Sequence, residues 1–395
     1  MQYVSDRVVH DADSHIFEPP GFYEPYADPE IRLVIADLER TEKDNVKQFV
    51  ADVTAAQRDP ELRAKDEDEV LLRKGFAGIG AFLAEDRPKA LDLLGFQSQL
   101  VFTTSFLGPL LRFERGEDPN VAYGVATAHN RGMADFCSAD ARLLPVSYVP
   151  LMDIERAAVA AQEAIEAHDA AALMISSLPP RTHSPSHVGL DALWARAQEA
   201  GVPIVFHVGG GKPMDPVYKE NGLPPVKDFT GGDGNFTSVS FMAIPDAPMQ
   251  TISTMIIDGA LERFPALKIG VIEQGASWVP GWMRSMDSAR DAFSKNEERL
   301  HKLSMLPSEY VRRQVRVTPY PHEPAGWVVQ NTGPEVCLFS SDYPHTEGGR
   351  NPLKRFEASL AGCTEAEKSA FYCGNFEDLM GPVLDRVRSV RVSGP

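Results

Sequence analysis

Short apolar runs alternate with amphipathic stretches along almost the whole chain, and this alternation constrains the fold more than any single motif. We predict eight strands, over residues 7–12, 98–103, 142–149, 171–176, 202–208, 267–273, 313–318 and 335–340. Helices are expected between them, most clearly over 152–168, 190–200 and 251–264. Strands that alternate with helices form parallel βαβ units, so the pattern predicts an α/β protein with a (β/α)8 TIM barrel. An open doubly wound sheet is the alternative, although no G-x-G-x-x-G motif follows the first strand.

Two segments do not fit the repeat, and we predict them to be insertions after the first and fifth strands. Residues 28–90 are expected to form a helical insertion, whose acidic part is a solvated face. Residues 209–250 are rich in glycine and proline and begin where a strand ends, which is the active face of a barrel. We therefore expect an active-site loop at 209–250. A barrel with two such insertions accounts for residues 1–395 as one domain.

The charge of the chain restricts its partners. With 39 basic and 56 acidic residues the net charge is −17, which argues against nucleic acid and against an anionic membrane surface. No apolar run approaches ~18 residues, so we expect no membrane span. The four cysteines form no C-x-x-C pair, which indicates free thiols and a cytoplasmic protein. A small-molecule substrate remains, and a bound cation would let the site accept a carboxylate.

Four of the predicted strands end in side chains that bind metal ions in proteins. Asp13 and His15 follow the first strand and, being two residues apart, point the same way along an extended chain. The other positions are His207 at the fifth strand, Glu273 at the sixth and Asp342 after the eighth. A carboxylate directly after an apolar run is costly to bury unless a cation or hydrogen bonds satisfy it. Because barrel strands end on one face, we predict that these residues meet around a divalent metal ion.

Taken singly, these positions also have ordinary structural explanations. Asp13 fits a turn or helix cap with His15 at the surface, and His207 fits a hydrogen-bonded histidine of the core. Other kinds of catalytic site find no support, because the chain has neither the G-x-S-x-G turn of serine hydrolases nor a phosphate-binding P-loop. The metal hypothesis therefore depends on the four strand ends occurring together.

Three further residues are candidates for contact with a substrate. Glu18 lies near the active face, with the capping of a turn as its alternative role. Arg181 could clamp a carboxylate with its fork of donors, with an exposed loop position as the alternative. His345, three residues after Asp342, is placed to orient that carboxylate or to touch the substrate. The remaining histidines and tryptophans near strand ends are expected to be solvated or to pack loops: His183, His187, His322, Trp278 and Trp282.

At four places, in this order, the chain reads DADSHIFEPP, FHVGGG, IEQGASWVP and SSDYPHTEGG. With these motifs it resembles the amidohydrolase superfamily over nearly its whole length, in particular the amidohydrolase-2 branch. That branch includes the aminocarboxymuconate semialdehyde decarboxylase type and the γ-resorcylate and 5-carboxyvanillate decarboxylases. The resemblance implies an enzyme with one divalent metal ion, zinc in the first place and manganese or iron as alternatives. It also implies a homodimer or a higher homo-oligomer.

The resemblance assigns metal ligation to Asp13, His15, His207 and Asp342. In the family the first ligand is a His or Glu, so Asp13 is a shorter replacement. The family's decarboxylases carry a His at the end of the sixth strand, where this chain has Glu273. A carboxylate at that position can act as a base or as an extra ligand, but not as a cationic acid. Asp342 takes the place of the family's proton donor.

Three functions remain open. The leading hypothesis is non-oxidative decarboxylation of a small carboxylated aromatic or unsaturated molecule, with Asp342 or Glu273 handling the proton. The first alternative is metal-dependent hydrolysis of an amide, ester or carbon–carbon bond through a metal-bound water. The second alternative is a non-catalytic barrel that binds a ligand. Glu273 favours hydrolysis, whereas the family resemblance favours decarboxylation.

Overall fold

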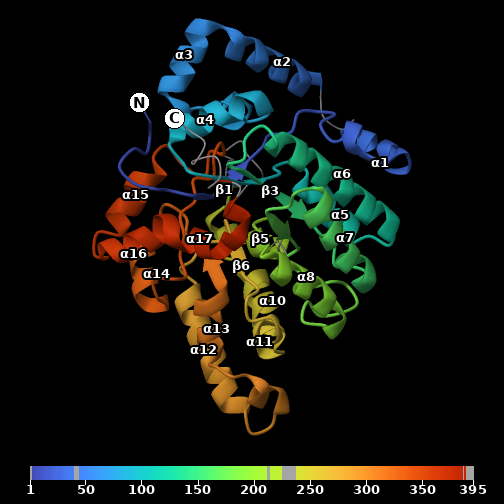
Figure 1. Ribbon diagram of the computed structural model, residues 1–395, viewed down its shortest axis with the longest axis vertical. Helices are drawn as coiled ribbons and strands as arrows, with labels where there is room; N and C mark the ends of the chain where they lie inside the picture. Colours follow the sequence, from blue (N-terminus) through green and yellow to red (C-terminus); the bar gives the residue numbers. More distant parts are fainter. Residues whose placement is uncertain (1, 40–43, 211–213, 225–236, 386, 388–395) are drawn as a thin grey trace.

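Parallel strands form the centre of the molecule and helices surround them (Figure 1). The computed structural model describes residues 2–39, 44–210, 214–224, 237–385 and 387. Within these residues the sheet has seven strands in sequential order: β1 (Asp11–His15), β2 (Gln99–Phe102), β3 (Leu143–Tyr148), β4 (Ala172–Met174), β5 (Ile204–His207), β6 (Ile269–Ile272) and β7 (Val315–Val317). Every neighbouring pair is parallel. The architecture is therefore α/β and resembles a TIM barrel.

The eighth predicted strand, 335–340, is not a regular strand. Its segment instead hydrogen-bonds through the backbone to Val317 of β7 and, further along, to Asp13 and His15 of β1. Two isolated bridges form there, from Val317 to Cys337 and from Ser14 to Tyr343, and between them Asp342 has a φ of 53°. The segment thus connects the two edge strands of the sheet without a continuous ladder.

The first predicted strand, 7–12, was placed too early in the chain. The observed strand β1 begins at Asp11 and includes the polar residues up to His15, all of them buried. The prediction followed the apolar pair Val8 and Val9, whereas the strand itself is polar because its side chains build the site. Its pairing with β2 shifts register between Asp11 and Ser14.

The helices match the βα alternation and are bounded by the local signals of the sequence. They are α1 (Pro29–Glu39), α2 (Asp44–Arg58), α3 (Pro60–Asp68), α4 (Arg87–Leu94), α5 (Leu107–Glu114), α6 (Pro119–Cys137), α7 (Ile154–Ala167), α8 (Asp191–Ala200), α9 (Ser238–Phe241), α10 (Asp246–Ile257), α11 (Ala260–Arg263), α12 (Val279–Phe293), α13 (Pro307–Gln314), α14 (Ala325–Thr332), α15 (Pro352–Ser359), α16 (Glu365–Ser369) and α17 (Asn375–Met380). Asp153 caps α7 through two backbone amides, and Gly201 ends α8 in the left-handed conformation. The helix predicted over 251–264 is divided into α10 and α11, because Gly259 adopts a φ of 80°.

The two segments predicted as insertions carry helices of their own. Helices α1 to α4 connect β1 to β2, and α2, α3 and α4 lie together at the top of Figure 1. The segment 209–250 contains the short helix η6 (Pro216–Lys219), α9 and the start of α10. Residues 40–43 of the first segment, and 211–213 and 225–236 of the second, lie outside the described residues. That these segments are insertions into one domain stays a prediction.

Two apolar clusters fill the space between the strands and around them. One cluster joins the strands to the surrounding helices. The other includes Phe102, Val146 and Val205 of the strands together with Phe376 and Leu379 of α17. Because apolar side chains fill this interior, the polar residues at the carboxyl ends of the strands mark the site. No helix in the described ranges is long and apolar enough to cross a membrane.

Candidate active site

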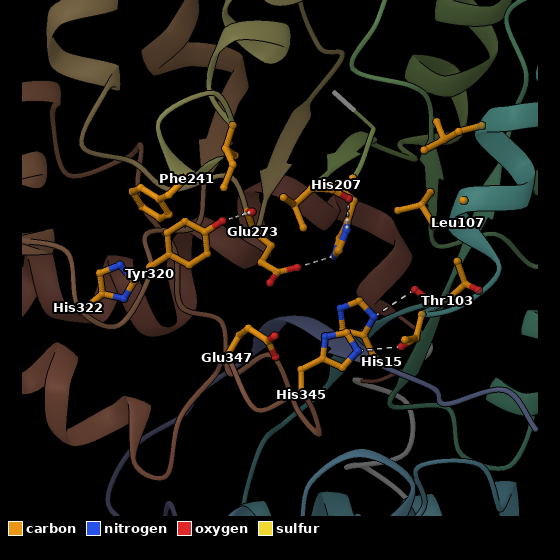
Figure 2. A pocket seen from close by; sticks show the side chains of 16 residues that line it. His15, Thr103, Leu107, His207, Phe241, Glu273, Tyr320, His322, His345 and Glu347 are labelled. Atoms are coloured by element: carbon orange, nitrogen blue, oxygen red, sulfur yellow. Dashed lines mark hydrogen bonds and ion pairs between the residues drawn. The ribbon is translucent and has the colours of Figure 1, made fainter. Parts of the chain in front are cut away.

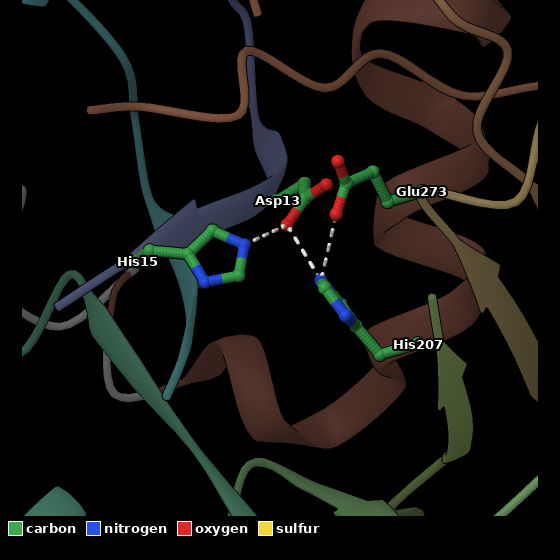
Figure 3. A group of neighbouring side chains, drawn as sticks. All are labelled: Asp13, His15, His207 and Glu273. Carbon is green, nitrogen blue, oxygen red and sulfur yellow. Dashed lines mark ion pairs between the residues drawn. The ribbon is translucent and has the colours of Figure 1, made fainter. Parts of the chain in front are cut away.

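Asp13, His15, His207 and Glu273 converge at the carboxyl ends of β1, β5 and β6 (Figure 3). The Oδ1 atom of Asp13 lies 3.1 Å from Nε2 of His15 and 3.4 Å from Nε2 of His207. On the other side, Nε2 of His207 lies 3.4 Å from Oε2 of Glu273. The predicted meeting of these strand ends is thus seen in the geometry. Three separate elements supply ligand atoms to one small space.

The polar atoms at this centre are buried and lack ordinary hydrogen-bond partners. They include both carboxylate oxygens of Asp13 and Asp342 and the Nε2 atoms of His15 and His207. Buried polar groups are normally hydrogen-bonded, so such a convergence indicates a ligand. Two imidazoles and carboxylates are a donor set that suits a divalent cation, and the residues therefore fit the implied metal ion.

The charge states of two residues also fit metal ligation. Burial alone would raise the pKa of Asp13, but its contacts with His15 and His207 hold that pKa below the usual range. Burial, together with the neighbouring His345, lowers the pKa of His15. The carboxylate is thus kept charged and the imidazole neutral, which are the forms that bind metal ions.

Backbone carbonyls orient both imidazoles of the centre. The Nδ1 atom of His15 lies 3.1 Å from the carbonyl oxygen of Thr103, and Nδ1 of His207 lies 3.0 Å from that of Val208. A carbonyl can only accept, so each Nδ1 carries the proton. In the neutral form of each ring the lone pair of Nε2 is therefore directed into the centre, as in metal sites whose ligands are fixed by outer hydrogen bonds.

Asp342 and His345 form a pair beside this centre. The Oδ1 atom of Asp342 lies 3.6 Å from Nε2 of His15 and 3.2 Å from Nδ1 of His345. The His345 ring stacks on that of His15 with 4.0 Å between centroids, and its Nε2 lies 2.8 Å from the hydroxyl of Thr104. His345 is thus held between a carboxylate and a hydroxyl, an arrangement suited to holding a proton beside Asp342.

The two candidate acid–base residues share an unusual backbone conformation. Glu273 and Asp342 have φ values of 54° and 53°, a region that few residues other than glycine adopt. The amide of Glu273 donates to Thr318, and its carbonyl accepts a 2.6 Å bond from the Tyr320 hydroxyl. Such strain at two strand ends is typical of functional positions, because surrounding bonds must hold it.

A cavity of about 470 Å³ opens above the centre (Figure 2). Its polar wall includes His15, His207, Glu273 and His345. The facing wall is largely apolar or aromatic, with Leu107, Leu111, Val208, Phe241, Ile244 and Tyr320. This size and lining suit a small molecule with one polar end and an apolar body.

Two residues predicted to contact substrate lie elsewhere. Glu18 is buried outside the cavity lining, and its carboxylate accepts hydrogen bonds from the loop after β2. Arg181 is exposed and donates to the carbonyl oxygens of Arg115 and Gly116. Arg181 thus takes its alternative role of an exposed loop arginine, whereas Glu18 holds the loop after β2 instead of contacting the cavity.

Sequence reasoning missed several residues of the site. Thr103 ends a predicted strand and Thr104 follows it, and the residue type of these threonines did not indicate a role in metal chemistry. His322, expected to be solvated, lines the cavity and stacks on Tyr320 with 5.4 Å between ring centroids. Glu347 also lines the cavity. Neither His183 nor His187 lines it; His187 is exposed and His183 is half-buried. The indole of Trp278 donates to the backbone just after Glu273, which agrees with its predicted packing role.

The family model described as amidohydrolase matches residues 80–380. The chain therefore belongs to the amidohydrolase family and is an enzyme of that superfamily, as its motifs indicated, which removes the non-catalytic alternative. No curated protein sequence matches the chain.

Solved structures of similar fold include an amidohydrolase from Mycobacterium avium subsp. paratuberculosis K-10, at 21% identity and a TM-score of 0.70, covering 96% of this chain and 100% of that one. A 5-carboxyvanillate decarboxylase from Novosphingobium aromaticivorans, complexed with manganese and 4-hydroxy-3-methoxy-5-nitrobenzoic acid, has 18% identity and a TM-score of 0.62, with 95% and 96% covered. A 2,6-dihydroxybenzoate decarboxylase from Rhizobium has 15% identity and a TM-score of 0.61, with 96% and 99% covered. At these identities the likeness concerns the fold.

Proposed function

We propose that this enzyme is a metal-dependent carboxy-lyase that removes CO₂ from a small carboxylated aromatic or unsaturated molecule. The observation that carries the proposal is the convergence of buried ligand atoms of Asp13, His15, His207 and Glu273, with Asp342 beside His15, next to a cavity with a largely apolar wall. Support comes from two solved structures of the same fold, which are decarboxylases of aromatic acids.

Asp13, His15, His207 and Asp342 would hold the metal ion, with Glu273 near enough to His207 to contribute. A divalent ion there supplies positive charge that binds the substrate carboxylate and stabilises developing negative charge. We expect zinc from the mixed histidine and carboxylate set. Manganese and iron are the alternatives, and manganese is present in the 5-carboxyvanillate decarboxylase structure.

Asp342 is the proposed proton donor. When the carbon–carbon bond to the carboxylate breaks, CO₂ leaves and the carbon that keeps the electron pair takes a proton. His345 lies 3.2 Å from Asp342 and bonds on its other side to Thr104, so it can return a proton to the carboxylate. Apolar residues such as Leu107 and Phe241 exclude water from the rest of the substrate.

Hydrolysis is the second candidate, and Glu273 is the observation that favours it. This carboxylate lines the cavity, and its Oε2 lies 3.4 Å from Nε2 of His207. In that position it could take a proton from an attacking water molecule. An amide, ester or carbon–carbon bond would then be the one that is cleaved.

The test is an assay of the metal-loaded enzyme on a panel of hydroxybenzoates and acyl compounds. We expect CO₂ release from at least one aromatic acid, measured together with the decarboxylated product. Hydrolysis of an acyl compound without CO₂ release from any acid would replace the first proposal with the second. The oligomeric state and the cellular compartment stay predictions.

A further inference from the structure

We infer that Glu18 is a positioning residue for the proposed metal centre, because it holds the loop that orients two of the site's imidazoles. The side chain is only 6% exposed and does not line the cavity. It lies three residues after His15, on the segment that leaves β1. Its function therefore has to come from the groups that it bonds.

The carboxylate of Glu18 is surrounded by donors. Its Oε1 accepts from the Tyr23 hydroxyl at 3.1 Å, from the Thr104 amide at 3.1 Å and from the Thr103 hydroxyl. Its Oε2 accepts from both the amide and the hydroxyl of Ser105, each at 3.0 Å. Both oxygens of Glu18 are thus hydrogen-bonded to the three residues that follow β2.

Two of these three residues orient the imidazoles. The Thr103 carbonyl accepts from Nδ1 of His15, and the Thr104 hydroxyl bonds to Nε2 of His345. One buried carboxylate thus fixes a loop whose other hydrogen bonds set the rotation of two rings. Outer groups of this kind typically change metal affinity about 10–100-fold when they are removed.

The chain offers a matched control in Glu114. This carboxylate is also 6% exposed and also holds a loop, through the Leu151 amide and the Tyr148 hydroxyl. None of these three residues lines the cavity or belongs to the ligand cluster. Replacing Glu114 therefore disturbs an equally buried carboxylate without reaching the proposed centre.

The inference rests on the proposed metal-dependent function, and its test measures binding rather than activity. The affinities of wild type, Glu18→Gln and Glu114→Gln for Zn²⁺ and Mn²⁺ are compared by competition with a chelating indicator. Glu18→Gln places an amide donor against the donors of the loop. We expect it to weaken metal binding about 10–100-fold, while Glu114→Gln lowers the melting temperature and leaves the affinity unchanged.

A milder variant keeps the test decisive if Glu18→Gln does not fold. Ser105→Ala removes one hydroxyl donor to Glu18 and leaves the backbone bonds, and we expect a fewfold weaker affinity. Metal binding as tight as in wild type, in whichever of the two variants folds, overturns the positioning role and leaves the metal site standing. A wild-type protein that binds neither ion overturns the proposed function, and the role of Glu18 with it.

Discussion

On each side of the site a buried glutamate holds a loop by accepting hydrogen bonds from its backbone amides, but the two loops serve different purposes. Beside β1 and β2, the buried carboxylate of Glu18 accepts hydrogen bonds from backbone amides of the loop after β2. The same loop contacts the imidazole ring of His15. Beside β6 and β7, the buried carboxylate of Glu323 accepts the amides of Ala276, Ser277 and Tyr320. Tyr320 in turn bonds the carbonyl of Glu273, so this network fixes the backbone of Glu273 rather than its carboxylate.

This difference separates the proposed metal ligands from the residue proposed to decide the reaction. The β1–β2 side orients the histidines that we propose as ligands, whose geometry any metal-dependent reaction needs. The β6–β7 side presents Glu273, the position at which the chain departs from the decarboxylases that it resembles. Variants on the first side should therefore change metal binding, and variants on the second should change chemistry.

The largest effect is expected from removing a ligand. His207→Ala deletes an imidazole that lies within 3.4 Å of two carboxylates, and we expect stoichiometric metal to be lost from the purified protein. Elemental analysis measures this directly. His322→Ala, which changes a cavity residue outside the ligand cluster, should retain its metal. Equal metal content in both variants would break the assignment of ligands.

The next largest effect, on the rate of CO₂ release, distinguishes the roles of Asp342 and Glu273. If Asp342 donates the proton, Asp342→Asn should lower CO₂ release about 10²–10⁴-fold, because the amide cannot supply it. Glu273→Gln should then lose less than about tenfold, by the same argument. Steady-state rates, with metal content measured in each variant, decide between them. The reverse ranking would assign the proton to Glu273 instead of Asp342.

The stability of the folded protein is expected to depend on pH through a buried histidine on the β1–β2 side. His129 packs against Tyr23 and Phe106 there, and burial lowers its pKa to about 4, partly offset by a bond to Asn130. The unfolded chain binds this proton near pH 6.5, whereas the folded protein does not. Stability contributed by His129 is therefore lost as the pH falls from about 6.5 to 4. Asp11, whose burial raises its pKa to about 7, acts in the opposite direction.

Because the contributions of His129 and Asp11 to stability oppose each other, the contribution of His129 is measured as the difference in melting temperature between the wild type and a His129 variant. Melting temperatures of the metal-free wild type and of His129→Gln are compared between pH 7.5 and pH 4.5. The gap between the two proteins should change in favour of the variant as the pH falls. A gap that stays constant with pH would show that His129 is protonated in the folded protein as readily as in the unfolded chain.

The smallest effect, a change in kcat, is expected from a substitution on the β6–β7 side. Tyr320→Phe removes the 2.6 Å hydrogen bond to the Glu273 carbonyl, which typically contributes about 1 kcal/mol. We expect a fewfold change in kcat and an unchanged metal affinity. A loss of metal from this variant would contradict the separation of the two sides.

The alternation of strands and helices was readable from the sequence because burial against helices requires apolar runs of predictable length. Strand β1 was misplaced for the opposite reason: residues such as Asp13 serve the site and have no apolar pattern. The hydrogen bonds of Thr103 could not be predicted from the sequence, because they depend on the carboxylate of Glu18, 85 positions away. The strand-end histidine His207 could be predicted, since its residue type and its position carry the information together.

Among the described residues that line the cavity there is no lysine or arginine. A carboxylated molecule would therefore enter a space whose fixed charges, from Glu273 and Glu347, repel it. The proposed metal ion at the base of the cavity would supply the attraction, so the two components should bind in a set order, the metal ion first and the acid second. A metal-free preparation would then have no measurable affinity for its own substrate, and titration with an aromatic acid would report the fraction of protein that holds the ion.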